Sequence, residues 1–207
     1  MTRGVFLTFE GIDGSGKSTQ ARRLAEALRS EGREVVLTRE PGGSPGAEAI
    51  RRLLVEGDPE RWSAETEILL FTAARRDHLE RTIRPALARG AVVISDRFAD
   101  STRVYQGTAR GDLGTLVDEL HDRLIGIEPD LTFIIDMDPA LALARGLARR
   151  SGEDRFEDMG ESFQGRLRDG FLALARRFPE RCRVIDGAAD PDTVAARVRA
   201  EARRLPA

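Results

Sequence analysis

The sequence predicts a single α/β domain, built on a doubly wound five-stranded parallel sheet with helices on both faces. Two observations lead to this prediction. Short runs rich in Val, Ile and Phe recur between longer stretches with helical periodicity. Most of these runs lack the polar alternation of a strand with one wet face, as expected for strands covered on both faces. A chain of 207 residues is long enough for one such domain with a substantial core.

Five segments have the character of buried strands, and each ends in a charged residue. The predicted strands are residues 5–10, 34–39, 91–96, 131–136 and 183–186. In an open parallel sheet, ligands bind beyond the carboxyl ends of the strands. We therefore expect the charged residues at the strand ends to lie together at one edge of the sheet, where a ligand would bind. These residues are Glu10, Arg39, Asp96 and Asp136.

Helical periodicity fills the gaps between the predicted strands. The predicted helices are residues 17–30, 47–54, 66–89, 113–125, 139–150, 162–178 and 191–203. Two of them begin with an Asp-Pro pair, Asp138-Pro139 and Asp190-Pro191, in which the aspartate caps the helix and proline fills its first turn. The polar segment RRSGEDRFEDMG, residues 149–160, lies between two helical patterns. We expect it to be a mobile flap, part of an arginine-rich lid at about residues 145–160.

Composition and charge exclude several classes of function. The 33 Lys+Arg and 35 Asp+Glu residues give a formal charge of -2, which argues against a nucleic-acid-binding surface. No apolar run approaches the roughly 18 residues of a membrane span, and the first residues lack the pattern of a signal peptide. We therefore expect a cytoplasmic protein with no membrane association. One cysteine and two histidines exclude an intrachain disulfide and a cysteine- or histidine-rich metal site, so any metal is expected on oxygen ligands.

The segment GIDGSGKST matches the phosphate-binding pattern G-x4-G-K-[ST], after a predicted strand and at the start of a predicted helix. In such a loop, backbone amides and the helix N-terminus hold phosphate oxygens. Lys17 would bridge the β- and γ-phosphates of ATP, and Ser18 would offer its hydroxyl to Mg²⁺. The residues predicted to contact ATP in this loop are Gly11, Ile12, Asp13, Gly14, Ser15, Gly16, Lys17, Ser18 and Thr19.

Lys17 is the only lysine in the chain, and this narrows the classes of phosphate-loop protein. The N-K-x-D element of guanine-specific GTPases and the second lysine of ParA-like partition ATPases both need another lysine. With one lysine in the chain, the sequence matches neither a typical guanine-specific GTPase nor a typical ParA-like ATPase. The LSGGQ signature of ABC proteins is also absent.

Residues that could hold a phosphoryl acceptor follow the second and third predicted strands. Asp96 and Arg97 open the segment DRFADSTRVYQG, where the acid could hold a Mg²⁺-bound water and the arginine could grip an acceptor phosphate. Arg39 in TREPGG and Arg51 in the next helix point to the same edge. The alternative for Asp96 and Arg97 is that they form an ordinary surface ion pair at the end of a strand, without a role in binding.

Phe71 and Arg75 stand four residues apart, so they share one helix face. An aromatic ring with an arginine one turn away could stack on a planar base and hydrogen-bond its edge. The alternative is a core phenylalanine beside a solvated arginine, which is the commoner arrangement for such a pair.

Taken in order, six segments resemble bacterial thymidylate kinases, which are nucleoside monophosphate kinases of the P-loop NTPase type. The segments are FEGIDGSGKST, TREPGG, FTAARRDHL, DRFADSTRVYQG, PDLTFIIDMDP and the arginine-rich DRFE stretch. The resemblance runs from about residue 5 to residue 187. It implies transfer of the γ-phosphoryl group of ATP to dTMP, giving ADP and dTDP in a step of dTTP synthesis. It also implies a requirement for Mg²⁺ and a homodimer.

The resemblance implies a role for each residue of the acceptor site. Phe71 would stack on thymine, Arg75 would hydrogen-bond its edge, and Tyr105 would lie where a ribose 2′-hydroxyl projects. Asp13 would face the acceptor sugar near its 3′-hydroxyl. The implied dTMP-binding residues are Asp13, Arg39, Arg51, Phe71, Arg75, Arg97, Ser101, Thr102, Tyr105 and Gln106, and the implied metal contacts are Ser18 and, through water, Asp96.

A loop with Asp13 but no arginine needs a cation from elsewhere for the charge on the transferred group. The resemblance implies that the lid supplies it, and an arginine so placed is typically worth about 10³ to 10⁵ in rate. The candidates are Arg145, Arg149, Arg150 and Arg155, with Arg145 also beside the adenine of ATP. The predicted catalytic residues are then Lys17, Asp96, Arg97, Arg149, Arg150 and Arg155.

Two other interpretations stay open. Another nucleoside monophosphate kinase or a deoxynucleoside kinase would keep the fold and the loop and bind a different acceptor. A nucleotide-sensing module would keep the loop and transfer nothing. The complete pattern DR-x3-ST-x2-YQG favours transfer, because a sensor has no use for an acceptor site.

Overall fold

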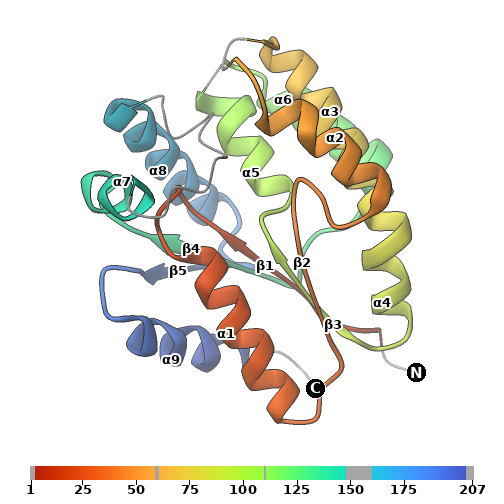
Figure 1. Ribbon diagram of the computed structural model, residues 1–207, viewed down its shortest axis with the longest axis vertical. Coiled ribbons are helices and arrows are strands. Elements are labelled where there is room, and N and C mark those ends of the chain that lie inside the picture. Colours follow the sequence, from red (N-terminus) through yellow and green to blue (C-terminus); the bar gives the residue numbers. More distant parts are fainter. Residues whose placement is uncertain (1–2, 59–60, 110, 148–159, 204–207) are drawn as a thin grey trace.

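A parallel five-stranded sheet forms the centre of the molecule, with helices on both faces (Figure 1). The computed structural model describes residues 3–58, 61–109, 111–147 and 160–203. The strand order is β2-β3-β1-β4-β5, and every adjacent pair is parallel. The strands are β1 (Phe6–Glu10), β2 (Val35–Arg39), β3 (Val92–Asp96), β4 (Leu131–Asp136) and β5 (Cys182–Asp186). The predicted fold class is confirmed, and each predicted strand agrees with an observed one to within one residue.

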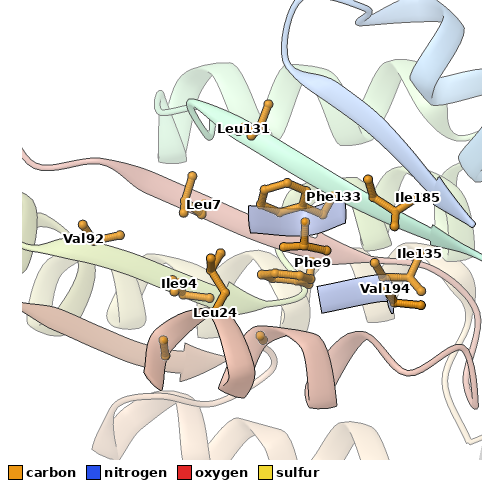
Figure 2. Close-up of a cluster of buried hydrophobic side chains, with 13 residues drawn as sticks. Leu7, Phe9, Leu24, Val92, Ile94, Leu131, Phe133, Ile135, Ile185 and Val194 are labelled. Atoms are coloured by element: carbon orange, nitrogen blue, oxygen red, sulfur yellow. The ribbon is translucent and has the colours of Figure 1, made fainter. Parts of the chain in front are cut away.

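The strands at the centre of the sheet are buried on both faces. Every residue of β1 is buried, whereas β2 and β5 at the edges are partly exposed. Side chains of β1 alternate between two cores, because successive residues of a strand point to opposite faces. Leu7 and Phe9 pack against α1 (Lys17–Ser30) and α9 (Pro191–Ala202), in the cluster drawn in Figure 2. Phe6 packs on the other face in a separate cluster.

The helices agree with most of the predicted ones. Besides α1 and α9, they are α2 (Pro45–Val55), α3 (Ala64–His78), α4 (Arg84–Ala88), α5 (Ala99–Val104), α6 (Gly114–Leu120), α7 (Pro139–Leu147) and α8 (Gly160–Arg177). Both Asp-Pro start signals are confirmed. Asp138 Oδ1 accepts the amide of Ala140 at 3.0 Å, and Asp190 Oδ1 accepts that of Asp192 at 3.0 Å.

Two predicted helices are interrupted by π-helical turns, and one helical segment was not predicted. The helix predicted over 113–125 consists of α6 and the π-helical turn η3 (His121–Ile125). The single helix predicted over 66–89 is divided into α3, a π-helical turn η1 (Leu79–Ile83) and α4, and Pro85 lacks an amide hydrogen to donate at the start of α4. The sequence also gave no sign of α5 and the π-helical turn η2 (Tyr105–Ala109) that follows it. The buried positions of α5 include Asp100, Thr102 and Arg103, so its buried face carries no apolar stripe.

The carboxyl ends of the strands meet at one edge of the sheet. Arg39 is in register with Asp96, and Phe9 is in register with the same residue from the other side. The loop of residues 11–16 leaves β1 at this edge and leads into α1, while the chain after β3 leads into α5. Among the described residues, no helix has the length and apolar character needed to cross a membrane.

Candidate active site

A cavity of about 400 Å³ opens beyond the carboxyl ends of β1, β2 and β3. Its walls come from the loop before α1, the loop after β2, and helices α2, α3 and α5. All of the predicted acceptor residues line it: Asp13, Arg39, Arg51, Phe71, Arg75, Arg97, Ser101, Thr102, Tyr105 and Gln106. Gly14, Lys17, Ser18 and Asp96 line the same cavity. The predicted acceptor residues therefore share one space with part of the predicted ATP site, whereas Gly11, Ile12, Ser15, Gly16, Thr19 and Arg145 do not line the cavity.

The loop between β1 and α1 needs glycine where the backbone turns. Gly14 has φ +83°, and a Cβ there would lie 1.9 Å from the carbonyl oxygen of Ala142 in α7. Gly16, with φ +99°, is the residue before α1, and no side chain caps this helix. Because the first amides of a helix carry a partial positive charge, an uncapped N-terminus at a cavity suits a phosphate group.

Asp13 collects three donors from both sides of the cavity. Its Oδ1 accepts from Lys17 Nζ at 2.9 Å and from Arg97 Nη2 at 2.5 Å, and its Oδ2 accepts from the Tyr105 hydroxyl at 3.0 Å. Burial alone would raise the pKa of Asp13, but Arg97 and Lys17 hold it well below its usual range. The carboxylate is therefore an anion, and it lies among acceptor residues as predicted. Its pairing with Lys17 was not foreseen.

Arg97 is held tightly at the base of the cavity. It has φ +71°, the only positive φ among the described residues other than glycine. Its Nη1 donates to Ser101 Oγ at 2.9 Å, and its guanidinium lies 5.0 Å from the centre of the Tyr105 ring. Burial opposes the charge, but Asp13 raises the pKa of Arg97 above its usual value, so the cation persists. Such backbone strain gathers at functional sites.

Asp96 and Ser18 have the chemistry of a magnesium site. Asp96 Oδ1 is buried and has no hydrogen-bond partner in the part of the chain that the structure describes. A buried carboxylate oxygen without a donor is costly unless a ligand satisfies it. No cluster of three potential metal-binding acids, histidines or cysteines occurs among the described residues. Hydroxyl and carboxylate oxygens such as those of Ser18 and Asp96 are ligands that Mg²⁺ accepts, and this ion also keeps several waters and binds substrate phosphates.

The far end of the cavity carries the residues predicted to contact the base. Arg75 is 4% exposed and donates from Nε to Glu40 Oε2 at 2.7 Å, so it is not a solvated surface arginine. Its Nη2 donates to Thr102 Oγ1 at 3.0 Å. Gln106 is also buried, and its Nε2 donates to Glu67 Oε2 at 3.0 Å. Phe71 contributes a partly buried ring to the same wall.

Arg39 and Arg51 lie at the exposed side of the cavity. Arg39 Nη2 donates to Glu48 Oε2 at 3.2 Å, and both side chains are about half exposed. Arg51 Nη1 donates to the carbonyl oxygen of Pro41. Two guanidinium groups at the rim of a cavity are well placed to meet an anionic substrate.

Known proteins match this chain along nearly its whole length. The family model described as thymidylate kinase matches residues 9–198. The chain belongs to the thymidylate kinase family. The resemblance inferred from the six segments is thereby confirmed.

Members of the family are closely similar to the chain. A thymidylate kinase of Dinoroseobacter shibae is 73% identical, with 94% of both chains covered. One of Ruegeria pomeroyi is 70% identical, with 94% of this chain and 92% of the relative covered. A crystal structure of thymidylate kinase from Ehrlichia chaffeensis superposes with a TM-score of 0.80 at 40% identity, covering 97% of this chain and 99% of the other. These matches confirm the P-loop kinase fold.

The lid predicted for this thymidylate kinase family member falls mostly outside the described residues. Arg149, Arg150 and Arg155 all lie there. Arg145, in α7, is described, and its Nη1 donates to the carbonyl oxygen of Gly187 at 3.4 Å. The family resemblance implies that adenine lies between the helix around Arg145 and the loop of residues 186–190, and this contact joins the two.

Glu10 is a site residue whose role the sequence did not reveal. It is fully buried at the end of β1, where it accepts from the amide of Phe98 at 2.8 Å and from Ser101 Oγ at 2.5 Å. Burial, together with nearby Asp100, raises the pKa of Glu10 from 4.5 to about 7, although Arg97 opposes the shift. Glu10 thus fixes the start of α5 beside Arg97. The sequence signals for Glu10 were its place at the charged end of a predicted strand and directly before the phosphate loop.

Proposed function

We propose that this member of the thymidylate kinase family transfers the γ-phosphoryl group of ATP to dTMP, giving ADP and dTDP, with Mg²⁺ as the metal. The observation that carries the proposal is that every predicted acceptor residue lines one cavity with Lys17 and Ser18. The cavity volume, about 400 Å³, is of the size of a small-molecule site. The high identity to thymidylate kinases supports the same acceptor.

On the donor side, the loop amides and Lys17 bind the β- and γ-phosphates of ATP. Lys17 Nζ lies 2.9 Å from Asp13, so its charge is already held at the junction between donor and acceptor. When bound through Ser18 and, by way of water, Asp96, Mg²⁺ supplies positive charge that lowers the repulsion between the two nucleotides. Positioning and charge neutralisation account for most of the catalysis in phosphoryl transfer, so no strong base is needed.

On the acceptor side, the cavity orients dTMP from base to phosphate. Phe71 stacks on thymine, and Arg75 donates to a carbonyl oxygen at its edge. Arg97, Arg39 and Arg51 hold the phosphate. The Tyr105 hydroxyl is fixed on Asp13 at 3.0 Å, and burial and Asp13 raise the pKa of this phenol, so it stays a donor. A rigid ring beside the sugar disfavours a ribose 2′-hydroxyl.

The cation for the transferred phosphoryl group comes from the lid, in this proposal from one of Arg145, Arg149, Arg150 and Arg155. No arginine occurs in residues 11–19 to take that role. Of the four, Arg145 bonds to the carbonyl oxygen of Gly187. Closure of the lid would also keep water from the γ-phosphate, since an open site would hydrolyse ATP.

We propose a homodimer as the assembly, with α2 and α3 in the contact. Leu69 on α3 is 57% exposed and Leu53 on α2 is 38% exposed, whereas neighbouring Ile68 is fully buried. Helices α2 and α3 pack against each other, and a second copy of the chain would cover these two leucines. The molar mass in solution, from light scattering, distinguishes a dimer from a monomer.

The test of the function is a panel of acceptors with ATP and Mg²⁺: dTMP, dUMP, UMP, dCMP and thymidine. We expect dTMP to give the highest kcat/KM. Comparable turnover of UMP would indicate a different nucleoside monophosphate kinase. Phosphorylation of thymidine without that of dTMP would indicate a deoxynucleoside kinase. If dTMP produces no ADP at all, the protein is a nucleotide-binding module and not a kinase.

A further inference from the structure

We propose that Glu40 is a positioning residue for base recognition, which orients Arg75 toward the acceptor base and is itself oriented by His78. The proposal rests on the proposed function, because it assigns a task within the dTMP site. Glu40 does not need to touch the base. Its effect on specificity passes through the guanidinium of Arg75.

A continuous set of hydrogen bonds leads from the sheet to the cavity. Thr38 Oγ1, at the end of β2, lies 2.7 Å from His78 Nε2. His78 Nδ1 lies 3.0 Å from Glu40 Oε1, and Glu40 Oε2 accepts from Arg75 Nε at 2.7 Å. Each oxygen of the carboxylate therefore has its own partner, so that rotation of Glu40 would break both contacts.

The direction of the donors follows from the chemistry of the groups. An ionised carboxylate only accepts, so the proton on His78 lies on Nδ1 and is donated to Glu40. With that tautomer Nε2 is an acceptor, and the hydroxyl of Thr38 donates to it. The imidazole of His78 thus links β2 to the carboxylate through both of its ring nitrogens.

The surroundings allow these side chains little freedom. Relative exposures are 5% for Glu40, 4% for Arg75 and 0% for His78. A Cβ at Gly43 would lie 2.4 Å from both His78 Nε2 and Thr38 Oγ1, so the loop after β2 closes directly over the imidazole. In such a low-dielectric setting a charged hydrogen bond is strong, and an unpaired arginine is unfavourable.

The contacts on Arg75 leave one part of its guanidinium for a ligand. Nε is bound by Glu40, and Nη2 donates to Thr102 Oγ1 at 3.0 Å and to the carbonyl oxygen of Phe98 at 3.1 Å. Nη1 has no hydrogen-bond partner among the described residues, and Arg75 lines the cavity. Because the guanidinium is planar, fixing Nε and Nη2 also fixes the direction of Nη1.

This geometry makes Arg75 selective for a carbonyl group. A donor of fixed direction pairs with the exocyclic oxygen of thymine and meets an amino group, also a donor, on cytosine. A site built to hydrogen-bond one group discriminates strongly against an analogue that leaves buried polar groups unpaired. Without Glu40 the guanidinium could turn away, and the discrimination between dTMP and dCMP would weaken.

The test is a double-mutant cycle with Glu40→Gln and Arg75→Ala. In the wild-type background, Glu40→Gln is expected to raise the KM for dTMP about tenfold and to lower the dTMP/dCMP ratio of kcat/KM by a similar factor, with the KM for ATP unchanged. In the Arg75→Ala background, the same substitution is expected to change the KM for dTMP by less than about twofold. Glu80→Gln is the matched control, because Glu80 also pairs with an arginine, Arg76, but on an exposed surface. This substitution should change neither the KM for dTMP nor the dTMP/dCMP ratio of kcat/KM.

Each result decides the proposal. An equal loss in both backgrounds, or an equal rise in the KM values for dTMP and ATP, would show that Glu40 does not act through Arg75. If Glu40→Gln does not fold, the cycle is repeated with Glu40→Asp, and failure of that variant to fold would make Glu40 a requirement of the fold and overturn the proposal. Wild-type protein that does not phosphorylate dTMP would refute the proposed function instead, whereas an active wild type with an unaffected Glu40→Gln refutes only this inference.

Discussion

Arg75 and Arg103 are both buried arginines bound to carboxylates, but only Arg75 lines the cavity. One group of charged residues surrounds Arg75 at the cavity and another surrounds Arg103 in the interior. Helix α5 lies between these two groups. Ser101 and Thr102 of α5 and Tyr105 at the start of η2 face the cavity, whereas Asp100 and Arg103 belong to an internal network that does not reach it. The same short helix therefore serves a functional site with some of its positions and the interior of the fold with others.

The internal network is a connected set of ion pairs that reaches the surface at Arg177, which pairs with Asp118. Asp100 Oδ1 accepts from Arg103 Nη1 at 2.8 Å, and both oxygens of Asp100 accept from Arg181, Oδ2 at 2.5 Å and Oδ1 at 2.9 Å. Arg103 also donates to Asp118 at 2.9 Å and to Glu128 at 2.7 Å. Burial and strong pairing therefore do not by themselves indicate a catalytic site. What distinguishes the cavity group is its place at the carboxyl edge of the sheet.

The largest expected difference between the two regions comes from Lys17→Ala in the cavity. Removing the only side-chain cation of the phosphate loop should lower kcat by at least about a thousandfold. The melting temperature should change little, because Asp13 keeps Arg97 and Tyr105 as partners. Steady-state kinetics and a thermal melt measure the two effects. Substantial turnover by this variant would contradict the role given to Lys17.

The opposite pattern is expected for Asp100→Asn in the internal network. Neutralising this carboxylate removes the more buried of the two counter-ions that Arg103 and Arg181 share, the other being Glu128, and should lower the free energy of unfolding by about 3 kcal/mol. The kcat/KM per folded molecule should stay within about twofold of the wild-type value. Urea denaturation and activity below the transition measure both quantities.

Asp192→Asn is the control for the internal network. Asp192 is 86% exposed and pairs with Arg23, so its loss should change the free energy of unfolding by less than about 0.5 kcal/mol. A fall in kcat/KM for Asp100→Asn as large as that for Lys17→Ala would remove the distinction between the two regions.

The strands could be predicted from the sequence because buried strands consist of runs of apolar residues. The prediction failed at α5, where Asp100, Thr102 and Arg103 occupy buried positions and no apolar stripe exists to reveal a helix. Polar residues are buried there because ion pairs satisfy them. Such pairing depends on residues far along the chain, such as Arg181, which binds Asp100. The local periodicity of the sequence therefore does not reveal it.

The same limit applied to the site. The resemblance to a known family implied that Phe71, Arg75 and Arg97 belong to one acceptor site, and all three line the cavity. The spacing of Phe71 and Arg75 alone left core packing open. The partners of these residues were not predictable. Glu40 meets Arg75 across 35 positions of sequence and His78 across 38, so only the folded chain shows that they meet.

Glu10 connects the two regions, and its titration gives the smallest of the three effects. One oxygen binds the amide of Phe98 and the other Ser101 Oγ beside the cavity, while Asp100 of the internal network helps to raise the pKa of Glu10 to about 7. A carboxyl group with a raised pKa in the folded state binds more protons when folded than when unfolded between pH 4.5 and 7. Its stabilising contribution is therefore complete below about pH 4.5 and is lost as the pH rises through 7.

Replacing Glu10 by Gln should remove this pH dependence while keeping an acceptor for the amide of Phe98. From pH 5 to pH 7.5 the wild type should lose about 2 kcal/mol of unfolding free energy more than Glu10→Gln does. Urea denaturation of both proteins at the two pH values measures the difference. The acids with lowered pKa values titrate below this window and leave it undisturbed; they are Asp13, Asp77, Asp118, Glu128, Asp186 and Asp190. If the unfolding free energy changes equally with pH in the two proteins, Glu10 is already ionised at pH 5. The contacts that α5 makes with Glu10, between the cavity and the internal network, would then stabilise a carboxylate and not a protonated carboxyl group.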